Sequence, residues 1–277
     1  MKTLGVDIGG TKTAIGIVDT KRGKVIDLHI MPSKKYKNDI KNLKEIVNSA
    51  IKISQQNRVR HIGIGVPELI TNDEIIKGNY NFNWNNKNLK EYFPKPYKVK
   101  VNSDVRCHLI AEQKFGKGIN SKNFIYINIG SGLSYAHFKD KKIYTGDKGY
   151  AIHFASSVIS LYDWKKNKKI SITPEDFYSG KEILKVIEKF GKSKSIHKVL
   201  ASISESLGSL IANLINSVDP GLVVLGGGVV MHHEKFKKEV IQNTRRFILA
   251  TDVKKIKIVS SQFKDITGVL GSGLLFN

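Results

Sequence analysis

The segment from residue 4 to residue 19 constrains this chain more than any other. It reads Leu-Gly-Val-Asp-Ile-Gly-Gly-Thr-Lys-Thr-Ala-Ile-Gly-Ile-Val-Asp, which is an apolar strand, a tight turn and a second apolar strand. Asp7 ends the first strand, and the turn is made of Gly9, Gly10 and Thr11. Adjacent glycines let backbone N–H groups approach an anion closely. The turn suits a phosphate, with Lys12 adding positive charge and Asp7 placed to hold a divalent cation.

Two further glycine clusters follow strand-like segments. Residues 124–129 lead into Gly130, Ser131 and Gly132, and residues 133–138 then repeat the strand–turn–strand plan of the first segment. Residues 222–225 run into Gly226, Gly227 and Gly228 and then a predicted helix. A buried parallel strand that feeds a glycine turn and a helix is a usual place for a nucleotide. The first turn alone also fits a plain β-hairpin, whereas the repeated plan predicts two related halves that clamp phosphates.

In combination, these clusters resemble the superfamily of actin, heat-shock chaperones and sugar kinases (ASKHA). Within it the chain is similar to the ROK family and related glucokinases from Lys2 to Phe276. The resemblance implies an α/β protein with a two-domain actin-like ATPase (ribonuclease H-like) fold and a nucleotide and substrate cleft between the domains. The expected domains are residues 1–105, with a C-terminal helix at 266–277 packing back on them, and residues 106–265. ATP, Mg²⁺, a sugar substrate and a homodimer are implied with it.

Length and cysteine content agree with this expectation. A chain of 277 residues suits two domains of ordinary size, or one larger α/β domain. The longest apolar runs are far shorter than a membrane span, and the first strand begins without a signal pattern. The single cysteine, Cys107, excludes an internal disulfide and a cysteine-rich zinc site. We therefore expect a cytoplasmic protein with no membrane partner and no zinc.

The net charge of +22 comes almost entirely from lysine, since only six of the 46 basic residues are arginine. Basic surfaces bind nucleic acid through its phosphates. The sequence has no helix-turn-helix ahead of the first strand, no zinc finger and no aromatic-plus-basic RNA signature. Nucleic acid is therefore not the expected partner, and the charge suits an anionic substrate such as ATP.

Apolar periodicity predicts the main helices and strands. Strands are expected to Ile8, at 13–19, 24–30, 61–67 and 97–101, then at 124–129, 133–138 and 222–225. Helices are expected at 40–51, 105–115, 180–190, 203–218 and 268–276. The asparagine-rich stretch at 79–88 and the segment at 145–157 are expected to be irregular.

Phosphoryl transfer to an alcohol needs a base for the acceptor hydroxyl, and Asp104 is the best candidate. It lies where a predicted strand ends and a helix begins, so an N-capping role is the alternative. Residues 101–108 resemble the ROK motif Val-Glu-Asn-Asp-Ala-Asn-Ala-Ala, in which the catalytic aspartate falls on Asp104. Ser103 stands where the family has a sugar-binding asparagine, and Arg106 replaces a later asparagine.

Two other segments resemble sugar-binding motifs of the family. Asn81 and Asn83, in Asn-Phe-Asn-Trp, are similar to a glucokinase segment whose asparagine binds a sugar hydroxyl, and an amide offers both a donor and an acceptor. The alternative is a polar loop anchored by Trp84. Glu175 matches the family glutamate that binds sugar hydroxyls, and otherwise is a first-turn carboxylate favoured by the helix dipole.

The segment from 146 to 157 departs from the family. Where zinc-free glucokinases carry a glutamate and a histidine, this chain has Lys148 and Ala151. His153 is expected to supply a substrate ligand from a shifted register, or else to be a structural histidine. Cys107 is expected to be a packing residue.

The sequence predicts an ATP-dependent kinase for a hydroxyl of a hexose or hexose-like sugar, with Asp104 as general base. The alternative is a nucleotide-binding ROK-like protein without sugar kinase activity, or a kinase for a non-standard or anionic acceptor. Three altered positions support that alternative: Ser103, Lys148 and Ala151.

Overall fold

The computed structural model describes every residue except 192, 194 and 253–254. The chain divides into two compact units. Unit 1 consists of residues 1–122, 136–152 and 261–277, and unit 2 of residues 123–135 and 153–260. The predicted boundary between residues 105 and 106 differs from this division. It would cut helix α2 (Asp104–Phe115), which packs on α8 (Thr267–Gly273) within unit 1.

Unit 1 is built on a five-stranded sheet with the order β3-β2-β1-β4-β7. Its strands are β1 (Lys2–Ile8), β2 (Lys12–Asp19), β3 (Lys24–Pro32), β4 (His61–Val66) and β7 (Lys98–Ser103). The first three strands form an antiparallel meander, and β4 and β7 run parallel to β1. Functional groups gather where parallel strands end, and here β1, β4 and β7 end at Ile8, Val66 and Ser103.

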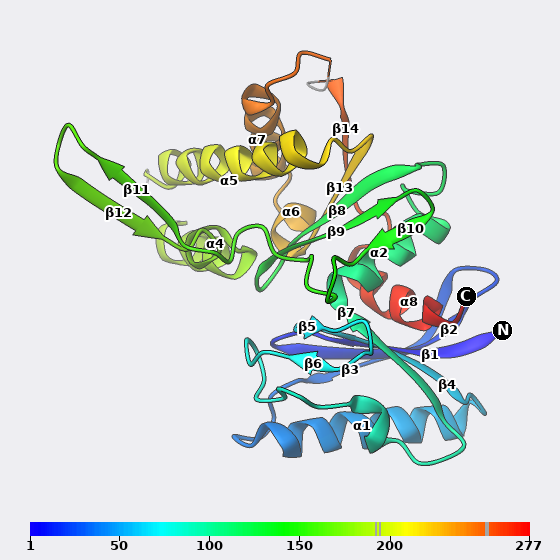
Figure 1. Ribbon diagram of the computed structural model, residues 1–277. Helices are drawn as coiled ribbons and strands as arrows, with labels where there is room; N and C mark the ends of the chain where they lie inside the picture. The colour runs from blue at the N-terminus through cyan, green and yellow to red at the C-terminus, as the bar shows by residue number, and fades with distance from the viewer. Residues whose placement is uncertain (192, 194, 253–254) are drawn as a thin grey trace. The chain divides into compact units, whose positions relative to one another are not determined.

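Helices cover both faces of this sheet (Figure 1). Helix α1 (Asp39–Gln56) packs its apolar side on one face, and its first turn is capped by Asn38, whose side chain accepts the N–H of Lys41 at 2.9 Å. On the other face α8 approaches β1 and β4 closely, which only glycine permits. A Cβ on Gly5 would lie 2.0 Å from a carbonyl of α8, and one on Gly63 would lie 1.8 Å from another. The last residues of the chain are thus part of unit 1.

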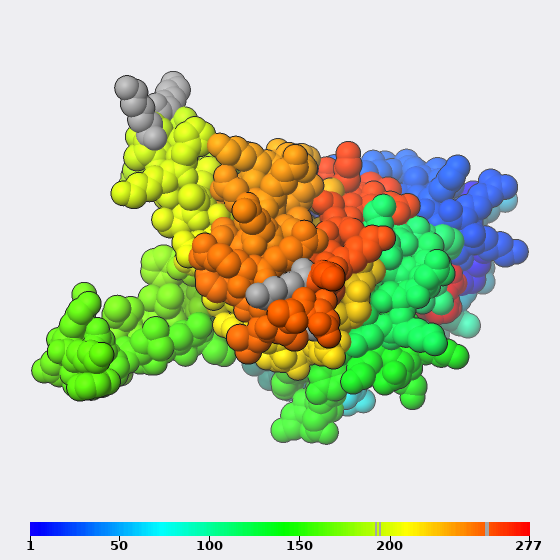
Figure 2. Space-filling model, turned by 90° about the horizontal axis from the view of Figure 1, so that it is seen from above, coloured from blue at the N-terminus to red at the C-terminus, as the bar shows by residue number. Residues whose placement is uncertain are grey.

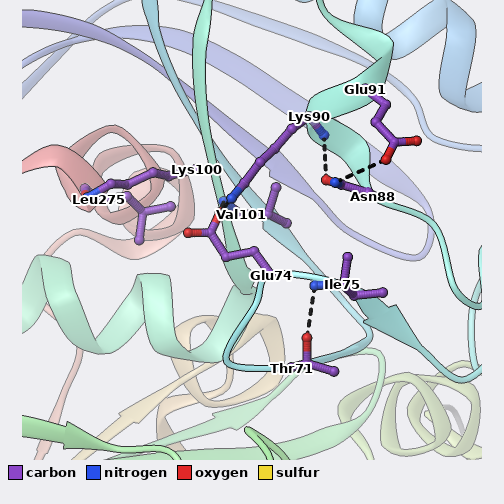
Figure 3. Close-up of polar contacts among 9 residues, drawn as sticks. All are labelled: Thr71, Glu74, Ile75, Asn88, Lys90, Glu91, Lys100, Val101 and Leu275. Carbon is purple, nitrogen blue, oxygen red and sulfur yellow. Dashed lines mark hydrogen bonds and ion pairs between the residues drawn. The ribbon is translucent and has the colours of Figure 1, made fainter.

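Short elements support β7 from the side (Figure 3). Glu74 lies between β5 (Leu69–Ile70) and β6 (Ile76–Lys77), and its carboxylate accepts the N–H of Val101 at 2.8 Å and pairs with Lys90 at 3.1 Å. Lys90 belongs to the 3-10 helix η1 (Leu89–Tyr92). These contacts fix the middle of β7, two residues before the strand ends at Ser103. Two more 3-10 helices, η3 (Lys264–Ile266) and η4 (Leu274–Phe276), flank α8.

The second sheet has the order β10-β9-β8-β13-β14. Its strands are β8 (Asn123–Ile129), β9 (Leu133–Lys139), β10 (Lys142–Tyr144), β13 (Leu222–Gly226) and β14 (Lys257–Ser260). β13 runs parallel to β8 and β14. A separate two-stranded hairpin of β11 (Ile159–Asp163) and β12 (Lys168–Ile172) also belongs to unit 2.

The helices of unit 2 are α3 (Glu175–Tyr178), α4 (Gly180–Phe190), α5 (Ile196–Val218), α6 (Gly228–His232) and α7 (Glu234–Phe247). α5 and α7 pack closely, because Gly208 has no side chain where Asn243 and Thr244 meet it. Among the described residues only α5 is long and apolar enough to cross a membrane by length and composition, properties that core helices share. Its buried residues, including Leu207 and Ile211, belong to the core of unit 2.

The predicted helices and main strands are confirmed, mostly within two or three residues at their ends, but α1 ends at Gln56 rather than 51 and α5 begins at Ile196 rather than 203. The stretch at 79–88 contains no helix or strand. The helix expected after the third glycine cluster is present as α6 and α7, whereas β10, the β11–β12 hairpin and β14 were not predicted.

Candidate active site

The turn of unit 1 joins β1 to β2 at the edge where the parallel strands end. Gly9 donates its N–H to the carbonyl of Lys12 at 3.0 Å, which closes the turn, and the side chains of Thr11 and Lys12 are exposed. Beside it, Asp7 is half-buried at the end of β1. Gly268, in α8, leaves room for this carboxylate, since a Cβ there would lie 2.1 Å from Oδ2. An open backbone turn therefore lies next to a fixed carboxylate.

Burial raises the pKa of Asp7, and the charges of His108 and Lys12 oppose the rise. Burial lowers the pKa of His108, which the two carboxylates of Asp7 and Glu112 offset. A carboxylate that is costly to ionise gains most from a nearby cation. Asp7 therefore has the character of a cation ligand.

Asp104 is the first residue of α2 and directly follows β7. Its Oδ1 accepts the N–H of Val105 at 2.7 Å. The pKa of Asp104 is raised to about 7, mainly by burial and next by the negative charge of Asp7, while the Val105 N–H opposes the rise and Glu68 adds a smaller one. A capping bond alone would lower the pKa. The raised value instead suits a general base that works near neutral pH.

Glu68 is a buried carboxylate that the sequence reasoning missed. It follows Pro67 just beyond β4, is 2% exposed, and accepts the backbone N–H groups of Tyr80, Asn81 and Phe82 at 3.0, 2.6 and 3.0 Å. Burial raises its pKa, although these three N–H groups and Lys34 oppose the rise. Its position at the end of a parallel strand was the available signal.

The predicted sugar-binding asparagines lie in the loop that Glu68 holds. The amide of Asn81 donates to the carbonyl of Pro67 at 2.8 Å, while the side chain of Asn83 is exposed. The ring of Trp84 is fully buried and stacks on Phe82, so it anchors this loop. The two roles in sugar binding stay predictions.

Ser103 and Arg106 both point inward from the start of α2. The Ser103 hydroxyl is fully buried and has no hydrogen-bond partner among the residues outside 192, 194 and 253–254. This burial gives no support to the predicted sugar contact of Ser103. The guanidinium of Arg106 donates to the carbonyls of Thr145 and Gly149 at 3.3 and 2.9 Å. The residue that replaces a family asparagine thus fixes the segment from 145 to 149 onto unit 1.

That segment carries the other departures from the family. Lys148 is exposed and Ala151 is partly buried, with its N–H donated to the carbonyl of Thr145 at 3.1 Å. Gly149 has a φ of +90°, and a Cβ there would lie 2.4 Å from the carbonyl of Ile70. The side chain of Lys148 is therefore exposed on a segment whose backbone is held by Arg106 and by the close packing of Gly149. Cys107 is fully buried, burial raises its pKa, and it is a packing residue as predicted.

The turn of unit 2 repeats the first turn but is held differently. Gly130 donates to the carbonyl of Gly132 at 3.1 Å, and Ser131 is exposed. Immediately after the turn, the N–H of Leu133 donates to Glu175 Oε1 at 2.6 Å. A Cβ on Gly132 would lie 2.4 Å from the same oxygen. Glu175 therefore lies directly against the turn.

The second oxygen of Glu175 is also engaged. Ser156 donates its hydroxyl to Oε2 at 2.7 Å, and the same hydroxyl lies 3.0 Å from Nδ1 of His153. Burial lowers the pKa of His153, and the charge of Glu175 opposes this. Glu175 and His153, predicted separately as substrate ligands, are thus brought together through Ser156, which the sequence analysis did not single out.

The third glycine cluster joins β13 to α6. Gly227 has a φ of +98°, and a Cβ there would lie 2.2 Å from the carbonyl of Ile129. Gly226 packs against the Tyr126 hydroxyl, whereas a Cβ on Gly228 would meet nothing within 4 Å. Only Gly228 therefore borders open space.

A cavity of about 220 Å³ lies in unit 2 where α4, α5 and α7 meet. Its lining includes apolar and polar groups: Ile187, His197, Leu200, His233, Glu234 and Phe236. His233 directly follows α6, which begins at Gly228. In the described part of the chain, no group of three or more His, Cys, Asp or Glu side chains is placed to hold a metal ion.

Comparison with known proteins identifies the class. The ROK family profile matches residues 3–160 and 159–277. A glucokinase of Thermotoga maritima is 22% identical over 312 residues, covering 98% of this chain and 96% of that protein. A xylose repressor of Caldicellulosiruptor bescii is 24% identical over 262 residues, covering 82% of this chain, which spans only 65% of the repressor's length.

The fold is also that of solved ROK proteins. The structure of a ROK family glucokinase from Streptomyces griseus, in complex with glucose and AMPPNP, matches with a TM-score of 0.84 at 19% identity, covering 99% of this chain and 98% of that one. The chain therefore belongs to the ROK family and has the two-domain actin-like α/β fold predicted from its sequence. Sugar kinases and repressors both occur among its relatives.

Proposed function

We propose that this protein is an ATP-dependent kinase that phosphorylates a hydroxyl of a hexose or hexose-like sugar. The observation that carries the proposal is Asp104, a partly buried carboxylate with a pKa of about 7 at the end of a parallel strand. Glucokinases that align with nearly the full chain support the substrate class.

In this proposal Asp104 takes the proton of the acceptor hydroxyl. Its Oδ1 is held by the Val105 N–H at 2.7 Å, which leaves Oδ2 to receive the proton. Proton removal by a positioned base contributes about 10²–10⁴-fold to a rate. Glu68 holds the loop of Asn81, and we propose that Asn81 and Asn83 orient the sugar.

Each glycine turn, considered within its own unit, has backbone N–H groups that suit a phosphate of ATP. These are Gly9, Gly10, Thr11 and Lys12 in unit 1, and Gly130, Ser131 and Gly132 in unit 2. Mg²⁺ bound to the phosphates would neutralise their charge, and Asp7, whose pKa is raised by burial, is the carboxylate fitted to it. Phosphoryl transfer depends mostly on such positioning and neutralisation.

We assign the adenosine to the cavity beside α6. The third glycine cluster (Gly226, Gly227 and Gly228) leads into α6, and a Cβ on Gly228 would meet no atom within 4 Å. The cavity of about 220 Å³ offers apolar surface from Ile187 and Leu200 and polar groups from two histidines. A small apolar pocket with a few polar groups is typical for a nucleotide base.

The test is a coupled ADP-release assay over neutral, acylated and acidic sugars, with thermal shifts by ATP measured in parallel. We expect ADP release with at least one sugar, and release from Asp104→Ala that is slower by about 10²–10⁴-fold. An ATP-induced shift without turnover on any sugar would overturn the kinase assignment.

A second candidate is a nucleotide-binding ROK protein without sugar kinase activity, or a kinase for an anionic acceptor. Buried Ser103 offers less to a neutral sugar than the family asparagine does, and both oxygens of Glu175 already accept hydrogen bonds. Exposed Lys148 favours an acidic or phosphorylated sugar. The acidic sugars in the panel distinguish the two forms of this candidate.

We also propose a homodimer, on the resemblance to the family alone. Sedimentation equilibrium at micromolar concentration should give twice the monomer mass of 31.0 kDa. A mass near that of one chain would contradict it.

A further inference from the structure

The β11–β12 hairpin has one aliphatic face and one hydroxyl face. The register pairs Ile159 with Ile172 and Leu161 with Ile170, which places these four side chains on the same side. The opposite side carries Ser160 and Ser171, whose hydroxyls are hydrogen-bonded at 2.9 Å, and Tyr162. The hairpin is therefore amphipathic, although it has no second layer of its own.

The aliphatic face lies open to solvent. Leu161 is 65% exposed and Ile170 48%, and Trp164, at the turn, is 74% exposed. Figure 1 shows the hairpin extending away from the helices of unit 2, and in Figure 2 it forms part of the bright-green lobe at the lower left. An isolated two-stranded hairpin is marginally stable in water, and an exposed apolar patch marks a surface that contacts something.

The tip of the hairpin carries a concentrated positive charge. Between the strands and at the start of β12 lie Lys165, Lys166, Lys168 and Lys169, all exposed. One acid, Asp163, is nearby, and it lies 3.9 Å from Lys166. The occupant of this surface must accept aliphatic side chains and an aromatic ring and must also be anionic.

The sequence predicts no membrane partner, but from this surface we propose that the hairpin docks on an anionic lipid bilayer. Aliphatic residues enter the acyl boundary, tryptophan and tyrosine favour the headgroup level, and lysines attract acidic headgroups. A nucleic acid would use the lysines and aromatic rings but leave the four aliphatic side chains exposed. A second copy of the chain would bring two hairpins of the same positive charge together, which is unfavourable.

The two tryptophans make the docking directly observable. Trp84 is fully buried, so a change in emission on adding vesicles reports on exposed Trp164. We expect the full-length protein to float with phosphatidylcholine vesicles that contain phosphatidylglycerol, with a blue shift in emission, and not with pure phosphatidylcholine. Binding should weaken as salt rises.

Two matched pairs of variants test the surface. Leu161→Asp should abolish the blue shift, whereas Leu249→Asp, at an apolar position that is even more exposed (82%), should leave it intact. The double variant Lys165→Glu, Lys168→Glu should weaken binding by at least about tenfold. The same charge change at Lys44 and Lys52, exposed on α1, should have a much smaller effect. Thermal melting of every variant confirms folding.

Each alternative gives a different result. Equal vesicle binding by Leu161→Asp and the wild type would mean general charge attraction and would overturn the proposal. A blue shift that appears on concentrating the protein alone, with a doubled mass that Leu161→Asp abolishes, would assign the surface to a second copy. Hairpin-dependent binding of single-stranded nucleic acid without vesicle binding would assign it to that partner.

Discussion

The two glycine turns have similar sequences, but the carboxylates near them differ: those of unit 1 have raised pKa values, whereas that of unit 2 is held by hydrogen bonds. In unit 1, Asp7 and Asp104 are partly buried and Glu68 is fully buried; the pKa values of all three carboxylates are raised, and the charges of Asp7 and Glu68 add to the rise at Asp104. Beside the turn of unit 2, both oxygens of Glu175 accept short hydrogen bonds, one of them from the turn itself.

This difference indicates that the two turns have different roles. Like charges kept close in a buried place cost stability, and proteins retain them where a proton must move. A carboxylate with satisfied hydrogen bonds costs little and fixes the backbone that it holds. We infer that the first turn lies beside the reacting groups and that the second is a rigid binding element.

The largest effect is expected from removing the proposed base, which tests the catalytic role assigned to unit 1. Asp104→Ala should lower turnover by about 10²–10⁴-fold, while ATP affinity measured by calorimetry stays near that of the wild type. Wild-type turnover should rise with pH through about 7, because Asp104 accepts a proton only when ionised. Turnover retained in the variant, or unchanged across that pH range, would contradict the role.

Two substitutions in the third glycine cluster distinguish an effect on nucleotide binding from an effect on folding. Gly228→Val places a side chain in the open space assigned to the adenosine, so it should weaken ATP binding by at least about tenfold. The melting temperature should not change, because a Cβ there meets no atom within 4 Å. Gly227→Val is the matched control, since its φ of +98° and the Ile129 carbonyl at 2.2 Å predict a lower melting temperature. If Gly228→Val binds ATP normally, the adenosine lies elsewhere.

Local patterns were enough to predict the turns and Asp104. A glycine pair after an apolar strand fixes a hairpin within a few residues, and a strand followed by a helix places Asp104 at their junction. Glu68 was missed because its partners lie 12–14 residues away in a loop without periodicity. The predicted domain boundary differs from the division into units because α2 packs on α8, which lies about 160 residues further along the chain.

The resemblance gave residue identities but not what each residue contacts. Glu175 aligns with a sugar ligand, yet its oxygens are engaged by Leu133 and Ser156. Arg106 replaces an asparagine and holds a loop instead. The β11–β12 hairpin was not predicted because its strands are five residues long and its apolar face becomes apparent only from the register.

A smaller effect is expected from releasing the second turn. Glu175→Ala removes the acceptor of the Leu133 N–H and should weaken ATP binding, measured by calorimetry, by about 5- to 100-fold. Glu175→Gln keeps an acceptor oxygen and should retain most affinity, and Glu182→Ala, on α4, is the control. A loss of sugar affinity with unchanged ATP affinity would instead make Glu175 a sugar ligand, as the resemblance implies.

The smallest expected effect is on stability and tests the charge argument without any substrate. The raised pKa of Asp104 means that its ionised form is less favourable in the folded protein than in the unfolded chain. This cost is absent when both states are protonated, below about pH 4, and it grows as pH rises towards 7. Asp104→Asn should therefore raise the melting temperature by at least about 2 °C at pH 8, with little gain at pH 4. The exposed carboxylate Asp73, changed to Asn, is the control. An equal gain at both pH values would show that Asp104 is not held at a raised pKa, and the two turns would then not differ in the way proposed.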